Sequence, residues 1–339
     1  MKLVSNLRRA TSLAVLGAAA LGVGAPASAA IIFNTGNAAT ATVAMGILDQ
    51  GHLNTEAGNI VSNSSATGLA FKFADGSWRD ATSPGCFCEG WGVSVNNATS
   101  GYANVSVDGV VNLSVVGAPV ATASTFTTTT ALTSLPGLTV THAYAPADNA
   151  PGALFKVVVT IRNETGAAVN DVKYVRVMDW DVPPTEFNEY VTIRGTATTT
   201  LLERSHNDGF ETANPLVNGA PITASTLNAD FEDLGPLDHG AYFRFNFGTI
   251  EDAAEYKFTI FYGAAGSEAA ALAAIGAESI ELYSLGQSNG GQRTGSPATF
   301  IFGFAGVGGT PVVPTPEPGS LALLGLGLAG LGFARRRRG

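Results

Sequence analysis

Short runs of β-forming residues, separated by turn residues, follow one another along most of the chain. The runs are about five to nine residues long and rich in Val, Thr, Ala and aromatic residues, which is typical of strands. Glycine, asparagine and proline stand between them, as in Asn163-Glu164-Thr165-Gly166. The pattern predicts strands over residues 69–73, 92–95, 103–107, 110–116, 124–132, 138–144, 154–162, 172–181, 189–194, 198–204, 241–247, 256–262 and 299–304.

A single stretch predicts a helix. Ser267 is a candidate N-cap, Glu268 lies in the first turn and alanines follow up to Gly276, with Leu272 and Ile275 facing a sheet. Residues 283–295 are polar and glycine-rich and predict a loop that leads into the last strand. Many short strands with one late helix predict a mainly β fold, a large antiparallel β-sandwich or jelly-roll-like body.

The N-terminus has the features of a secretory signal peptide. Lys2, Arg8 and Arg9 precede an apolar stretch over residues 12–24, and small residues at 27–29 fit a cleavage site. The sequence therefore predicts a signal peptide over residues 1–29, which is removed from the mature protein.

The C-terminus combines a proline motif, an apolar segment and a basic cluster. Pro316-Glu317-Pro318 is followed by residues 319–334, which carry no charge, and then by Arg335, Arg336, Arg337 and Arg338. The apolar segment is shorter than the roughly 20 residues of a full membrane span, but snorkelling arginines make up the difference. The arginines favour the cytoplasmic side, so the pattern predicts a transmembrane helix at 319–334 and a body outside the inner membrane.

These three parts in this order resemble the PEP-CTERM sorting domain of Gram-negative bacteria, over residues 315–339. An ordinary C-terminal anchor is the alternative interpretation. The resemblance implies recognition by an exosortase, cleavage near the motif, and release or transfer of the body to the cell surface. It also implies a precursor held in the inner membrane, in strains that make extracellular polysaccharide, which becomes the expected partner.

The body carries a strong negative charge. The two termini hold seven of the 18 Lys and Arg residues and one of the 27 Asp and Glu residues, which leaves 11 basic and 26 acidic residues and a net charge of −15. This charge argues against nucleic acid and anionic lipid as partners, and it fits an extracellular protein that holds divalent cations. We expect the body at residues 30–305, undivided or in two lobes that meet near 145–152, and a flexible linker at 306–314.

Cys86 and Cys88 are the only cysteines. An exported body permits a disulfide, but a C-x-C spacing places the two Cα atoms at the limit of what a bridge tolerates in an extended strand. A turn after Pro84-Gly85 would bring them closer. Free thiols and intermolecular pairing remain open alternatives, and no second cysteine pair or nearby histidine completes a zinc set.

The densest acidic group follows a predicted strand. Asp179 and Asp181 lie on one face of that strand with Trp180 on the other, and Glu186 and Glu189 come shortly after. Carboxylates and loop oxygens of this kind predict a calcium site, although the spacing is not that of an EF-hand. In the alternatives, the acids pair with Arg176 or Arg194 or cap loop amides, or they act as acid and base on a glycosidic bond.

The sequence has no nucleophile elbow, phosphate-binding loop or dinucleotide-binding motif, and its four histidines form no metal-binding pattern. We therefore interpret the body as a binding or structural protein of the cell surface or extracellular matrix, associated with extracellular polysaccharide. The rival hypothesis is a secreted glycan hydrolase that uses Asp179, Asp181 and Glu186 or Glu189.

Overall fold

The computed structural model describes residues 29–289 and 298–312. The predicted signal peptide, up to Ser28, and the sorting tail lie outside the described residues. Among the described residues, no helix is long and apolar enough to cross a membrane.

Three antiparallel sheets form the body. The ten-stranded sheet has the order β16 (Phe231–Leu237), β14 (Glu189–Arg194), β19 (Leu282–Gln287), β20 (Thr299–Ala305), β18 (Glu255–Ala265), β12 (Leu154–Asn163), β11 (Leu135–Pro146), β10 (Phe126–Leu132) and β8 (Leu113–Val115), and β9 (Val120–Ala121) also pairs with β10. The six-stranded sheet has the order β15 (Leu202–His206), β17 (His239–Asn246), β13 (Lys173–Trp180), β5 (Gly90–Val95), β6 (Thr99–Asn104) and β7 (Gly109–Val111). The four-stranded sheet runs β1 (Ala30–Phe33), β2 (Val43–Ile47), β3 (Leu69–Lys72) and β4 (Trp78–Asp80).

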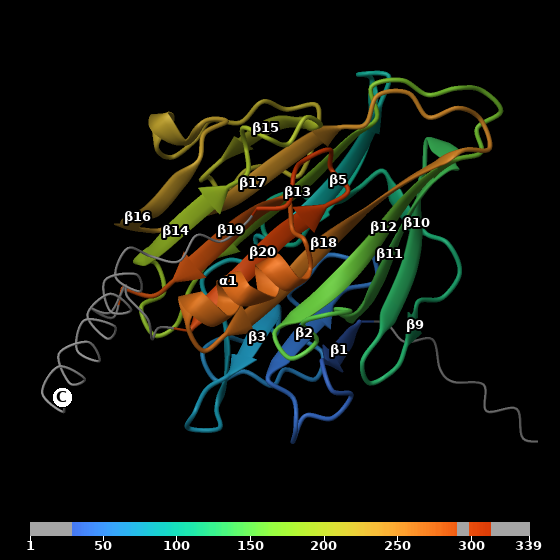
Figure 1. The fold of residues 1–339 in the computed structure, drawn as a ribbon. Coiled ribbons are helices and arrows are strands. Elements are labelled where there is room, and N and C mark those ends of the chain that lie inside the picture. Colours follow the sequence, from blue (N-terminus) through green and yellow to red (C-terminus); the bar gives the residue numbers. More distant parts are fainter. Residues whose placement is uncertain (1–28, 290–297, 313–339) are drawn as a thin grey trace, which may run out of the picture.

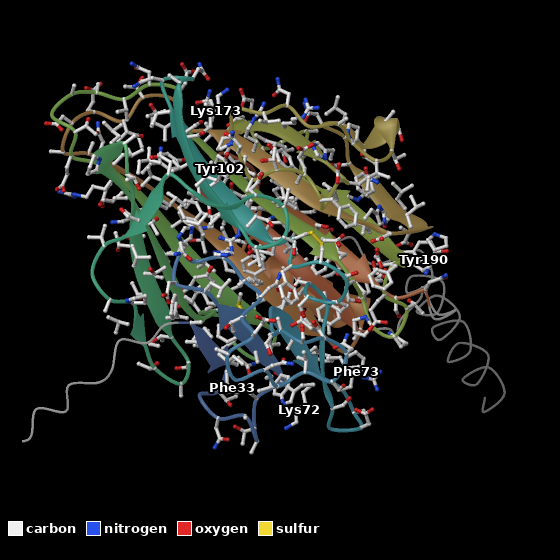
Figure 2. All side chains as sticks on the ribbon, turned by 180° about the vertical axis from the view of Figure 1, so that it is seen from behind. Phe33, Lys72, Phe73, Tyr102, Lys173 and Tyr190 are labelled. Carbon is white, nitrogen blue, oxygen red and sulfur yellow. A yellow bond between two sulfur atoms is a disulfide. The ribbon has the colours of Figure 1, made fainter. Side chains whose placement is uncertain are left out.

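The two larger sheets share one core. Phe243 and Phe245 of β17 meet Phe302 and Phe304 of β20, with the rings of Phe243 and Phe304 5.2 Å apart and those of Phe245 and Phe304 4.9 Å apart. Strand β12 alternates buried and half-buried residues, as expected of a strand with one face on the core. This arrangement is consistent with the predicted β-sandwich, and Figure 2 shows the side formed by the six-stranded sheet, with Tyr102 of β6 and Lys173 of β13.

Helix α1 (Glu268–Ala277) covers the other face of the ten-stranded sheet (Figure 1). The Ser267 hydroxyl accepts a hydrogen bond from the Ala270 amide at 3.3 Å, which is the predicted N-cap. Ile275 is buried and Leu272 partly buried in one cluster with Phe261 and Ile301 of the sheet. The predicted helix and its apolar face are therefore confirmed.

Several strands differ from the sequence prediction. Residues 283–287, predicted as part of a loop, lie in the fully buried strand β19, because the helix covers one face of this strand and the core covers the other. The predicted strand 110–116 is divided at Asn112, whose φ of 53° turns the chain from the six-stranded to the ten-stranded sheet. Sequence patterns also missed β1, β2, β4, β9 and β16, and with them the third sheet.

A buried ion pair between Glu89 and Arg176 lies between the sheets. Both side chains have no exposed surface, and the Arg176 guanidinium donates to the Glu89 carboxylate. Glu89 precedes β5 and Arg176 lies on β13, so the pair joins neighbouring strands of the six-stranded sheet.

Polar groups from the rest of the molecule complete the pair. The Tyr262 hydroxyl, on β18 of the facing sheet, donates to Glu89 Oε1 at 2.9 Å, and the Leu53 amide donates to Oε2 at 2.7 Å. Arg176 Nη1 donates to the Gly51 carbonyl at 3.1 Å, in the loop after β2. Because burial removes these charges from water, they are tolerated only with this full set of partners.

The Glu89–Arg176 pair gives a stability prediction. We expect Arg176→Met to destabilise the protein by about 3–5 kcal/mol in urea unfolding, because Glu89 is left buried and unpaired. Adding Glu89→Gln should recover part of the loss, since the uncompensated charge is then removed. As a control, Lys156→Met removes an ion pair whose Asp148 is 68% exposed, and should cost at most about 1 kcal/mol. Equal losses at the two positions would show that the buried pair is dispensable.

Candidate metal centre

The chain crosses between the two large sheets twice at one place. It leaves the six-stranded sheet after Trp180, at the end of β13, and enters the ten-stranded sheet at Glu189, at the start of β14. It returns at Asp238, between the end of β16 and the start of β17. The crossings lie side by side, because Trp180 pairs with His239 and Glu189 pairs with Leu237.

Three aspartates converge where these crossings meet. Asp179, Asp181 and Asp238 each offer a carboxylate oxygen, and the three oxygens lie within 4.8 Å of one another. Asp179 is 1% exposed and Asp181 is fully buried, whereas Asp238 is exposed. Trp180, between the first two, points the opposite way and donates from Nε1 to the Ser284 hydroxyl at 3.0 Å.

Glu189 adds a fourth carboxylate, and the third buried one, at the same crossing. It has no exposed surface, and its Oε1 accepts a hydrogen bond from the His239 amide at 3.0 Å. Asp179, Asp181, Glu189 and Asp238 are called the carboxylate cluster below.

Burial dominates the electrostatics of the cluster. It raises the pKa of Asp181 to about 10, with the charges of Asp179, Glu189 and Asp238 acting in the same direction. Burial likewise raises the pKa of Glu189 to about 9, and that of Asp179 well above its usual range with the help of Asp238 and Asp208. The cluster therefore resists holding several negative charges unless positive charge is supplied.

The arginines that the sequence offered as partners are engaged elsewhere. Arg176 pairs with Glu89, and Arg194 pairs with Glu232 at 2.5 Å. The expectation that the acids pair with Arg176 or Arg194 is therefore wrong. Four buried oxygens of the cluster have no hydrogen-bond partner among the described residues, namely Asp179 Oδ1, both oxygens of Asp181 and Glu189 Oε2.

The predicted residue Glu186 is not among the converging aspartates. Its Oε1 accepts a hydrogen bond from Asn63 Nδ2 at 2.9 Å. Asp238 takes a place in the cluster that sequence analysis did not assign. Its only sequence signal is that it directly precedes a strand, since its approach to Asp181 depends on the pairing of β13 with β17.

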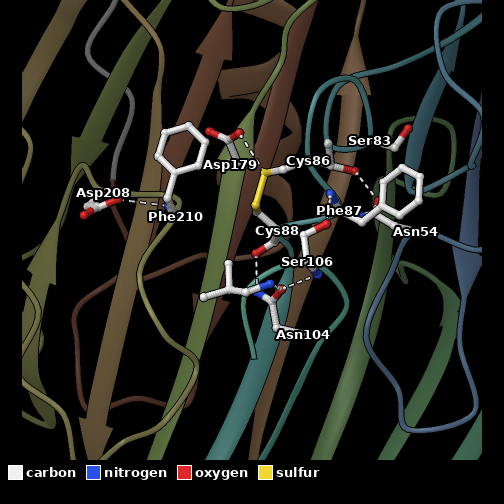
Figure 3. The surroundings of a disulfide bond; sticks show 12 residues. Asn54, Ser83, Cys86, Phe87, Cys88, Asn104, Ser106, Asp179, Asp208 and Phe210 are labelled. Carbon is white, nitrogen blue, oxygen red and sulfur yellow. Dashed lines mark hydrogen bonds between the residues drawn. A yellow bond between two sulfur atoms is a disulfide. The ribbon is translucent and has the colours of Figure 1, made fainter. Parts of the chain in front are cut away.

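A disulfide and a glycine contact close the site from one side. Cys86 and Cys88 are bonded, with Cα atoms 5.2 Å apart, and Cys86 Sγ lies 3.5 Å from Asp179 Oδ2 (Figure 3). A disulfide sulfur carries no hydrogen, so it screens Asp179 from water without donating to it. Gly209 packs directly on the strand, and a Cβ there would lie 2.6 Å from the Asp179 Cα.

The donor atoms fit a hard divalent cation. All are carboxylate oxygens, the ligands that calcium and magnesium prefer, and no sulfur or imidazole ligand from the described residues joins them. Two oxygens on one calcium ion are at most about 5 Å apart, which the three aspartate oxygens satisfy. Partnerless buried oxygens supply the second feature of such a site, so the cluster can hold a metal ion.

Comparison with known proteins identifies a family only for the C-terminal segment of the chain. Residues 314–338 match the family model of the PEP-CTERM protein-sorting motif. No curated protein and no solved structure matches the chain. The matched segment contains the Pro316-Glu317-Pro318 motif and the terminal arginines, and it begins two residues after Val312, the last described residue. The C-terminal segment is therefore a PEP-CTERM sorting motif, which indicates an exported protein that is sorted by an exosortase.

Proposed function

We propose that the body is a calcium-holding binding or structural protein of the cell surface or extracellular matrix, associated with extracellular polysaccharide. The observation that carries the calcium assignment is the convergence of Asp179, Asp181 and Asp238 with buried, partnerless oxygens. The sorting motif supports the location outside the inner membrane.

A calcium ion would neutralise the buried carboxylates of the cluster, which otherwise repel one another. Several buried carboxylates without a cation must share protons, because like charges at this distance repel strongly in a medium that screens poorly. A divalent ion replaces those protons and provides a partner for the orphaned oxygens. It would also tie both crossings together, since Asp181 and Asp238 come from different ones.

The exposed position of Asp238 allows polysaccharide to contact a calcium ion held by the cluster. Calcium takes about six to eight oxygens, and the protein side chains supply only part of this number. Asp238 is exposed, so this ligand lies on the solvent side of the cluster. Sugar hydroxyls are oxygen ligands that can occupy the remaining positions, so calcium gives a strongly acidic body a way to hold glycan.

The structure favours this proposal over hydrolysis of a glycosidic bond. Asp179, Asp181 and Glu189 are at most 1% exposed, so a sugar ring has no access to them in this conformation. A general acid and its partner flank the scissile bond, which requires a cleft between two accessible carboxyl groups.

Removing one buried ligand should separate calcium binding from folding. In excess calcium at pH 8 the wild type should gain about 2.7 kcal/mol at a hundredfold excess over the dissociation constant, a rise of several degrees in Tm. Asp181→Asn should lose this rise, yet match or exceed the wild type in chelator, because the neutral amide does not have to take up a proton when the protein folds. Asp148→Asn, at an exposed position, should behave like the wild type in both buffers. Equal calcium responses in all three proteins would contradict the assignment.

The raised pKa values predict opposite pH trends with and without calcium. The folded pKa of Asp181 is about 10 and that of Glu189 about 9, both above the unfolded values near 4. The folded state therefore binds more protons at these two groups in this window, so their contribution to metal-free stability is fully present below about pH 4 and is lost as pH rises toward 9–10. Calcium competes with these protons, so its effect on Tm should grow from pH 5 to pH 8. Thermal unfolding at several pH values checks both trends, and a calcium effect independent of pH would count against the cluster.

Retention on polysaccharide tests the wider proposal. We expect the protein to be retained on extracellular polysaccharide from its own producer in calcium and released by chelator. Asp181→Asn should be retained poorly in either buffer, and Asp148→Asn should bind like the wild type. Retention that is insensitive to chelator, or its absence in calcium, would contradict a calcium-mediated contact.

A further inference from the structure

The glycine-rich segment after the last strand is folded onto the body. Glu281 accepts backbone hydrogen bonds from three residues of this segment, Gly306 at 2.9 Å, Val307 at 3.0 Å and Gly309 at 2.8 Å. Successive amides that surround one carboxylate form an anion-binding nest. We call Glu281 with residues 306–309 the clamp; it replaces the flexible linker expected over this part of the chain.

Glycine is required for the clamp at two of its positions. Gly308 has a φ of 78°, and a Cβ there would lie 2.4 Å from the Thr200 hydroxyl. At Gly309 a Cβ would lie 2.7 Å from the Cβ of Glu281. The glycines that make this segment look like a linker thus allow it to pack closely.

Further contacts extend the docked segment to its last described residue. Thr200 donates from its amide and its hydroxyl to the Gly308 carbonyl, at 3.1 and 2.8 Å. The Val312 amide donates to the Ile280 carbonyl at 2.8 Å, and the Val312 side chain packs on the cluster beneath helix α1. The chain is therefore held to the body as far as Val312.

This docking limits the distance between the body and the sorting motif. Only residues 313–315 separate Val312 from Pro316 in the sequence. A chain spans at most about 3.6 Å per residue, so Pro316 lies within roughly 14 Å of Val312 whatever conformation the intervening residues adopt. An enzyme that takes this motif must therefore come against the part of the body around Val312.

That part of the body is a shaped, polar surface. A groove of about 320 Å³ lies there, between strands β14 and β19, helix α1 and the docked segment. Its lining includes Arg194, Thr198, Glu232 and Tyr283, together with Thr310 and Val312. Arg194 and Glu232 form an ion pair on its rim, with side chains 39% and 59% exposed.

We propose that this groove face is a contact surface for the exosortase, which rests against the body while it processes the motif. The clamp makes the contact obligatory, because it leaves too little chain for the motif to be taken at a distance. The inference depends on the sorting motif and the docked segment, and it is independent of calcium or polysaccharide binding.

A bulky side chain on the groove face tests the contact. The full-length precursor is expressed in exosortase-containing cells, and conversion to the processed form is followed after a pulse of synthesis. Thr198→Trp adds bulk at an exposed position of the groove, whereas Thr127→Trp adds the same bulk on β10, on a distant strand of the same sheet. We expect several-fold slower processing of Thr198→Trp and wild-type processing of Thr127→Trp.

A spacer variant separates steric contact from misfolding. Inserting about eight Gly and Ser residues after Val312 lengthens the tether without touching the clamp. In this background Thr198→Trp should be processed as fast as the spacer variant alone, because the enzyme no longer needs to meet the body. Processing of Thr198→Trp at the wild-type rate, or a delay that the spacer does not relieve, would overturn the proposal.

Discussion

The ion pair between Glu89 and Arg176 is the constraint on which the architecture depends. It brings β5 and β13 of one sheet, β18 of the facing sheet and the loop after β2 to a single buried point. Apolar packing alone tolerates sliding of one sheet over another, whereas hydrogen bonds to a buried charge fix the position of each donor and acceptor. The aromatic core between β17 and β20 then fills a space whose dimensions are already set.

The carboxylate cluster is the opposite case within the same sandwich. The Glu89 carboxylate is matched by Arg176, while the cluster gathers four carboxylates and no basic side chain pairs with its buried oxygens among the described residues. Both lie on or beside β13, so the fold that satisfies one buried charge leaves the other unsatisfied. Such a local conflict is expected where a protein keeps a binding site, since the missing partner arrives from outside.

Local patterns predicted much of this structure, and long-range pairing accounts for what they missed. The positions of β14 and α1, and the shared face of Asp179 and Asp181, follow from strand and helix periodicity and from a capping serine. Strand β19 was missed because its Ser, Gly and Gln residues suit a loop, and only the helix and the core bury it. Asp238 joins the cluster through the pairing of β13 with β17, and glycines 306–309 form a clamp only when Glu281 is beside them. In each case the structure depends on a contact that local sequence patterns and composition do not reveal.

Strand β20 has a consequence for biogenesis. It is the last strand of the described residues, yet it lies inside the ten-stranded sheet, paired with β19 on one side and β18 on the other. A chain that is exported from its N-terminus must therefore wait for nearly its whole length to emerge before this sheet can close. Until then β18 and β19 each present an open edge, the feature of sheets that is most prone to pair with other chains. Membrane anchoring of the C-terminus during this interval keeps incompletely folded molecules apart. Anchoring therefore reduces pairing between the open strand edges of different molecules.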